Sequence, residues 1–122
     1  MNTNERLIKI SETIKELGIN PAVHGYTFIR EAIELVMDDH NAIYGVTKIL
    51  YPTIAKKYDT TDKKVERSIR HAIESAFNRD NQDFWQEMFN YSRQAKNGRV
   101  TNSEFIATVA DYLILRELHG GS

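Results

Sequence analysis

Apolar residues recur every three or four positions along most of this chain, which is the spacing of a helix that buries one face. Leu7, Ile10, Ile14 and Leu17 form the first such set, and the same period returns further along. No stretch of useful length alternates between apolar and polar residues, so the pattern predicts no β-strand. The predicted fold class is all-α, a compact bundle of about six helices. Helical segments are expected at about residues 7–17, 26–38, 43–50, 52–58, 61–78, 81–90 and 101–119.

Residues that favour helix ends stand between these segments. Gly18 can take the left-handed conformation that stops a helix, and Pro52 suits a first turn. Thr60 or Thr61 can cap the helix that follows them by accepting a backbone N–H. Residues 101–104, Thr-Asn-Ser-Glu, form a capping box before the last helix. Because there are no linkers or repeats, we expect a single domain over residues 1–122.

The helix predicted at 61–78 has two contrasting faces. At about 100° per residue, Val65, Ile69, Ala72 and Ala76 lie on one side and predict a buried stripe. The opposite side is mostly charged and is free to face a partner. It carries Lys63, Arg67, Arg70, His71 and Glu74, with Lys64 and Glu66 flanking it.

The residues before this helix indicate a helix-turn-helix, predicted at about residues 52–78. Ala55 is small enough to let two helices cross closely, a turn with threonines follows, and Val65 anchors the second helix. Asp59 stands in the turn where glycine is usual. In this motif the second helix enters the major groove of DNA, so the charged side becomes a candidate DNA-reading surface.

The side chains on this surface suit different parts of a duplex. The planar fork of Arg67 matches O6 and N7 of guanine, and Glu66 can accept a hydrogen bond from N4 of cytosine. His71 and Arg70 can reach a base or a phosphate. We predict Glu66, Arg67 and His71 as the base readers. Contacts to the DNA backbone are predicted for Lys56, Thr60, Thr61, Lys63, Lys64, Arg70, Lys96, Asn102 and Ser103.

Charge is unevenly distributed along the chain, although the net charge is only −1. Residues 46–71 carry seven basic and three acidic side chains, whereas 1–45 carry four and seven, and 72–122 carry five and seven. Such a basic island can be an electrostatic footprint for phosphate. The alternative interpretation is a solvated helix face.

The composition argues against several other classes of protein. The 122 residues include no cysteine, which excludes disulfides and thiolate metal sites and favours a reducing cytosol. No apolar run approaches the roughly 18 residues of a membrane span, and the N-terminus does not resemble a signal peptide. The histidines lack metal-binding spacing, and no phosphate loop or nucleophile elbow occurs. We therefore expect a cytoplasmic, nucleoid-associated protein that is not an enzyme and needs no cofactor or metal.

Four large apolar residues, Phe84, Trp85, Met88 and Phe89, fall within six positions. Core packing is the simpler interpretation, but four such groups are too many for one narrow helix stripe, so one of them can be exposed and contact a second copy. A candidate partner surface is therefore predicted at Gln82, Phe84, Trp85 and Phe89.

Several stretches resemble one known family. "YPTIAKKY", "TTDKKVERSIRHAIESAF" and "VTNSEFIATVADYL" are similar to the C-terminal effector domain of the stage-zero sporulation response regulator, the master transcription factor of endospore formers. "GYTFIREAIELV" matches an earlier helix, and the resemblance covers roughly residues 7–115. It implies six helices with a helix-turn-helix, which bind short DNA boxes of the TGTCGAA type, often as tandem head-to-tail pairs. The family's base readers fall on Glu66, Arg67 and His71, with Arg70 and Lys64 nearby.

The resemblance also raises questions of organisation and partners. The family protein carries a phosphoacceptor receiver domain before this domain, and its absence here fits either an excised domain or a stand-alone relative. The family's surface for the RNA polymerase sigma subunit follows the recognition helix, where Phe84 and Trp85 replace smaller residues, so a repressor or a different partner fits as well. The alternative function is a helical protein-interaction module that regulates by binding another protein rather than DNA.

Overall fold

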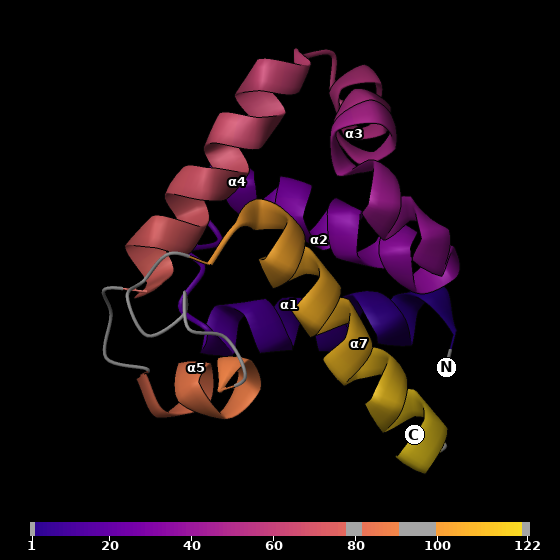
Figure 1. Ribbon diagram of the computed structural model, residues 1–122, viewed down its shortest axis with the longest axis vertical. Helices are drawn as coiled ribbons and strands as arrows, with labels where there is room; N and C mark the ends of the chain where they lie inside the picture. The colour runs from indigo at the N-terminus through magenta and orange to yellow at the C-terminus, as the bar shows by residue number, and fades with distance from the viewer. Residues whose placement is uncertain (1, 78–81, 91–99, 121–122) are drawn as a thin grey trace.

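The computed structural model describes residues 2–77, 82–90 and 100–120, and every regular element within these ranges is a helix. The predicted all-α fold class is therefore confirmed (Figure 1). The α-helices are α1 (Thr3–Glu16), α2 (His24–Asp38), α3 (Tyr51–Lys57), α4 (Asp62–Phe77), α5 (Gln82–Phe89) and α7 (Asn102–Gly120). A 3-10 helix, η1 (His40–Gly45), and a π-helix, η2 (Val46–Leu50), lie between α2 and α3.

The helix stop predicted at Gly18 and the capping box predicted at residues 101–104 are both present. Gly18 adopts φ 98° after α1, and its N–H donates to the Lys15 carbonyl at 2.9 Å. The Ile19 N–H reaches back to the Ile14 carbonyl at 2.9 Å, which completes a Schellman ending. At the start of α7, the Thr101 hydroxyl accepts the backbone N–H of the fourth capping-box residue at 3.1 Å.

The helix expected at residues 43–50 is not a regular α-helix. The Asp39 carboxylate accepts the Asn41 N–H at 3.1 Å and starts the tighter turns of η1. Pro52, in the first turn of α3, has no N–H for the carbonyl four residues earlier, so the α-helical ladder cannot run through it. Just before it, the Tyr51 N–H bonds the Val46 carbonyl five residues back, which gives the wider turn of η2.

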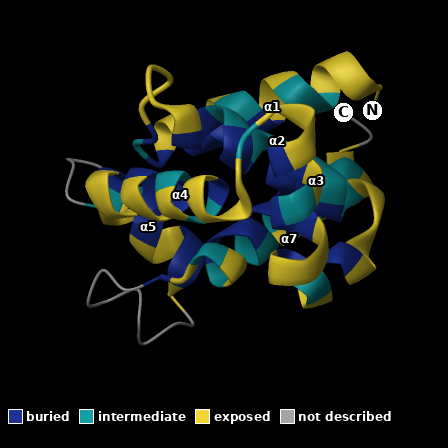
Figure 2. Ribbon diagram, turned by 90° about the horizontal axis from the view of Figure 1, so that it is seen from above, coloured by how far each residue is buried: buried dark blue, intermediate teal, exposed yellow. Residues whose placement is uncertain are grey.

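Helix α2 is the centre of the bundle and packs against α1, α4 and α7 (Figures 1 and 2). Its apolar stripe, predicted from the helical period, is buried: Tyr26, Ile29, Ile33 and Val36 all lie in the core. Because α2 supports α4 directly, the position of the predicted recognition helix is set by the packing between these two helices.

Helix α5 lies at the opposite end of the molecule from α3 (Figure 1) and covers the core there. Trp85 and Phe89 are 2% and 1% exposed, and their rings stack with centroids 5.1 Å apart. The Trp85 indole N–H donates to the Leu17 carbonyl at 2.7 Å, and Phe105 of α7 packs against both rings. These contacts join α5 to the end of α1 and to α7.

Candidate nucleic-acid interface

The turn between α3 and α4 has a defined backbone geometry. The Thr60 N–H donates to the Ala55 carbonyl at 2.9 Å and the Asp59 N–H to the Lys56 carbonyl at 3.4 Å, a second Schellman ending. Asp59 takes the left-handed conformation that this ending requires, with φ 52°, which aspartate tolerates better than most residues other than glycine. Thr61 then caps α4 by accepting a backbone N–H of its first turn at 3.2 Å. The predicted helix-turn-helix is therefore present in the fold.

A polar contact with α2 holds the end of α3 in place. The Glu31 carboxylate accepts the Lys57 ammonium at 2.8 Å and the Tyr58 hydroxyl at 2.7 Å. Burial raises the pKa of Glu31, but the hydrogen bonds from Lys57 and Tyr58 outweigh it, so the net pKa lies below the ordinary value. Lys57 and the neighbouring Lys56 are both exposed, and the ammonium group of Lys57 is bonded to Glu31.

Helix α4 presents the two faces that the sequence predicted. Val65, Ile69, Ala72 and Ala76 are all buried, together with Ile73. Figure 2 shows the opposite side of α4 exposed along its length. The basic residues of this side form what we call the cationic face, namely Lys63, Lys64, Arg67, Arg70 and His71. The exposed Glu74 lies on the same side of the helix.

One flank of the cationic face is tied to α7. The Asn102 side-chain N–H₂ donates to the Tyr51 hydroxyl at 2.9 Å and to the Glu66 carbonyl at 3.1 Å. Both of its donor hydrogens are therefore used inside the protein, and contact of Asn102 with DNA stays a prediction. Burial raises the pKa of Tyr51, although the bond from Asn102 opposes this.

The predicted base reader Glu66 also has an internal partner. Its half-buried carboxylate accepts the Arg70 guanidinium at 2.6 Å, one helical turn away on the same helix. The contact orients Arg70 along α4 and occupies one carboxylate oxygen of Glu66. Base reading by Glu66, Arg67 and His71 stays a prediction. Arg67 and His71 are exposed, whereas Glu66 is half-buried.

The other flank of the cationic face meets the first turn of α2, which the sequence analysis had not assigned to the site. An open groove of about 710 Å³ lies between the two helices. His24 and Thr27 line it from α2, and Lys64, Arg67 and His71 line it from α4. The helical period of the sequence could not predict that the first turn of α2 lies beside the cationic face, because this proximity depends on where α2 crosses α4.

The remaining predicted backbone contacts occupy accessible positions. Lys56, Lys63, Lys64, Thr61 and Ser103 are exposed, Thr60 is half-buried, and Arg70 is exposed beside Glu66. Ser103 lies in the first turn of α7, next to the flank that Asn102 ties to α4. Lys96 lies outside the described residues.

The candidate partner surface is smaller than predicted. Trp85 and Phe89 are core residues and present no surface to a partner, because the space beneath α5 accommodates more aromatic volume than one helix stripe suggested. Phe84 is half-buried, with its ring edge to face against Tyr112 at 6.2 Å. Gln82 is exposed, and its side chain donates to the Phe77 carbonyl.

Two kinds of feature are absent from residues 2–77, 82–90 and 100–120. Within those ranges, no group of three or more histidine, aspartate or glutamate side chains is placed to hold a metal ion. None of the helices described is long and apolar enough to cross a bilayer.

Comparison with known families gives one match over most of the chain. The model of the family described as "Sporulation initiation factor Spo0A C terminal" matches residues 10–113. The match includes α2, α3, α4 and α5, and it extends into α7.

Proposed function

Because the chain belongs to the family of Spo0A C-terminal domains, which are DNA-binding regulatory domains rather than enzymes, we propose that it regulates transcription by inserting α4 into the major groove of specific DNA boxes. The observation that carries the proposal is the cationic face: five basic side chains on one helix, backed by a buried stripe and preceded by a closed turn. A helix of about 10–12 Å diameter fits a major groove about 12 Å wide.

The side chains divide into base readers and phosphate contacts. Arg67 is exposed on the outer side of α4, where its two parallel N–H donors can meet O6 and N7 of a guanine. His71 follows one turn later and reaches the next bases along the groove. Lys56, Lys63, Lys64 and Arg70 contact phosphates, which adds affinity without adding sequence preference.

We propose boxes of the TGTCGAA type as the target, bound by two copies arranged head to tail. Family membership and the guanines of the box, which suit Arg67, support this choice. In this proposal the RNA polymerase sigma subunit contacts α5, where Gln82 is exposed and Phe84 is half-buried. In this proposal the protein acts at the nucleoid, and residues 1–122 work as one DNA-binding unit.

The test is a fluorescence-anisotropy titration of a labelled duplex that carries the box, against a scrambled duplex, at two salt concentrations. We expect preferential binding to the box, and four phosphate contacts give a slope of log K against log[salt] of about −3.6 per bound domain. Arg67→Ala should lower the affinity for the box by about 1–3 kcal/mol, which is roughly 5- to 150-fold, and relax the preference over the scrambled duplex.

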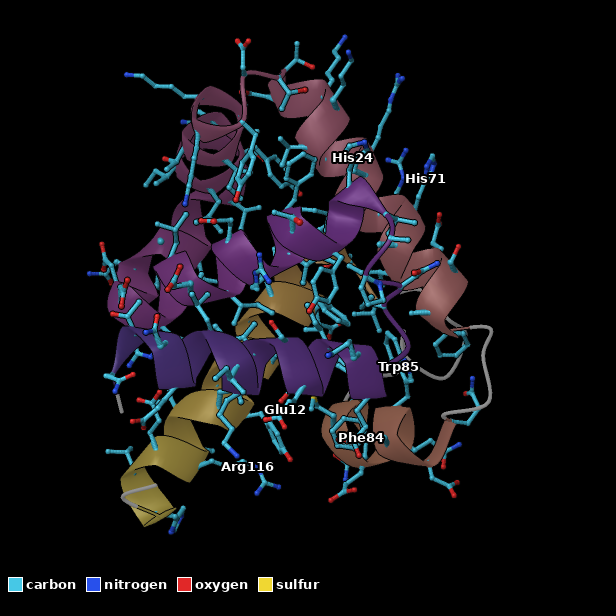
Figure 3. The ribbon with its side chains drawn as sticks, turned by 180° about the vertical axis from the view of Figure 1, so that it is seen from behind. Glu12, His24, His71, Phe84, Trp85 and Arg116 are labelled. Atoms are coloured by element: carbon cyan, nitrogen blue, oxygen red, sulfur yellow. The ribbon has the colours of Figure 1, made fainter. Side chains whose placement is uncertain are left out.

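Arg116→Ala is the matched control, because Arg116 is also an exposed arginine but lies on α7, away from the cationic face (Figure 3). It should bind the box as the unmodified protein does. Absence of binding to either duplex at low salt would refute the proposal and favour a module that binds another protein.

A further inference from the structure

His24 is a basic side chain outside α4 that lies beside the cationic face. It belongs to the first turn of α2, it is exposed, and it lines two adjoining grooves together with His71. Figure 3 shows His24 and His71 close together at the same end of the molecule, one from α2 and the other from α4. The two histidines therefore border one continuous surface.

The position of His24 relative to α4 is set by close packing. The next residue, Gly25, has no Cβ, and one built there would lie 2.3 Å from the Ser68 carbonyl oxygen of α4. The His24 ring stacks on Phe28 at a centroid distance of 6.4 Å, and Phe28 meets the edge of Tyr58 at 5.6 Å. The imidazole is thus held at the rim of the groove by both backbone and ring contacts.

The two flanks of α4 are occupied by different helices. On the helical wheel, Glu66 and Ser68 lie on opposite sides of the buried stripe. Asn102 of α7 contacts the Glu66 side, and the first turn of α2, with His24, contacts the Ser68 side. A helix that fills the major groove has a phosphate backbone along each flank, so α7 and α2 face opposite walls of the groove.

The chemistry of the α2 flank suits an anion. The larger groove is lined by the basic side chains Lys64, Arg67 and His71 and by hydroxyls such as that of Thr27. Asp59 is the one carboxylate among the residues that line it, and it lies in the turn before α4 rather than in α2 or α4. The first turn of α2 carries no acidic residue that would repel a phosphate beside His24.

We propose that His24 contacts a backbone phosphate of the DNA on the α2 side of the major groove, so that the duplex is held by α2 as well as by the helix-turn-helix. This inference rests on the proposed DNA-binding function and adds to it a second element that positions the duplex. The contact recognises phosphate, so it contributes equally to box and scrambled sequences.

The test adds charge at position 24 instead of only removing the side chain. His24→Lys should bind both duplexes more tightly at low salt and steepen the salt slope by about 0.9, the value for one additional neutralised phosphate. His24→Ala should weaken binding to both duplexes by about two- to tenfold, the range for one hydrogen bond. Leu118→Lys is the control, because Leu118 is exposed near the C-terminal end of α7 and gains the same charge there. Figure 1 shows this end of α7 far from α4.

The outcomes separate this inference from the function on which it rests. If His24→Lys matches Leu118→Lys in affinity and salt slope while Arg67→Ala still relaxes the preference for the box, DNA binding stands and the contact by α2 is overturned. If the unmodified protein binds neither duplex, the proposed function fails first. Melting curves of the variants establish that each is folded at the temperature of the titration.

Discussion

Replacing Gly25 by alanine tests how tightly α2 and α4 are packed, because two opposing effects decide the result. Alanine stabilises a helix relative to glycine by up to about 1 kcal/mol, and by less in a first turn such as this one. Against this, the added Cβ would lie 2.3 Å from the Ser68 carbonyl oxygen and 2.7 Å from the Ala72 Cβ. Both of these atoms are fixed by the backbone of α4, so neither can rotate away.

The size of the destabilisation by Gly25→Ala follows from the distance that α2 and α4 must move apart. Contacts between non-bonded atoms are comfortable at about 3.5 Å, so α2 and α4 must separate locally by about 1 Å. Overpacking of a filled core typically costs about 1–3 kcal/mol, and the upper part of that range applies where no side chain can yield. After the gain in helix propensity is subtracted, Gly25→Ala should destabilise the protein by about 1–2 kcal/mol. At about 4 °C per kcal/mol for a domain of this size, Tm should fall by about 4–8 °C.

Thermal unfolding followed by circular dichroism measures this change, with Gly45→Ala as the matched control. A Cβ at Gly45 would meet the Cδ1 atom of Ile49 at 2.7 Å, but that side chain is 51% exposed and can turn into solvent. Gly45→Ala should therefore change stability by no more than about 0.5 kcal/mol. A Tm of Gly25→Ala equal to or above that of the unmodified protein would show that the crossing is looser than the structure indicates, and the fixed position of His24 would lose its support.

Two further predictions concern contacts around the bundle. Asn102→Ala removes the bonds to the Tyr51 hydroxyl and the Glu66 carbonyl, so urea unfolding should show a loss of about 1–2 kcal/mol. An unchanged midpoint would mean that Asn102 does not link α7 to α4. The hydrogen bonds from Arg6 lower the pKa of Glu117, so the folded state holds this carboxylate ionised more strongly than the unfolded state does. The stabilisation is therefore present above about pH 4.3 and is lost as pH falls through the lower folded pKa. The unmodified protein should be more stable than Glu117→Gln at pH 7 and lose that advantage as the pH falls through the folded pKa of Glu117. A difference in stability that stays constant as the medium is acidified would contradict the linkage.

Short-range chemistry was sufficient to predict the α-helices and the two faces of α4, but not that η1 and η2 replace the helix expected at residues 43–50. The buried stripe from Val65 to Ala76 follows from the helical period, which every residue in a helix obeys whatever surrounds it. The same holds for the stop at Gly18 and the cap at Thr61, because a helix end satisfies its free backbone groups within a few residues. The family resemblance stated from the sequence agrees with the family match.

The sequence alone did not decide which residues meet across helices. Trp85 and Phe89 had two interpretations until the packing of α5 against α1 and α7 buried them. Asn102 has the chemistry of a phosphate contact, yet its donors are used by Tyr51 and Glu66, residues that lie 51 and 36 positions away.

What the sequence by itself determined is therefore the set of α-helices, the ends set by local caps and the charge on the outer side of α4. What only the tertiary structure decided is the neighbourhood of α4, with His24 on one flank and Asn102 on the other. The physical reason is that a helix is specified by hydrogen bonds between residues four apart, whereas a crossing is specified by shape. Here one missing Cβ, at Gly25, sets how closely two helices approach.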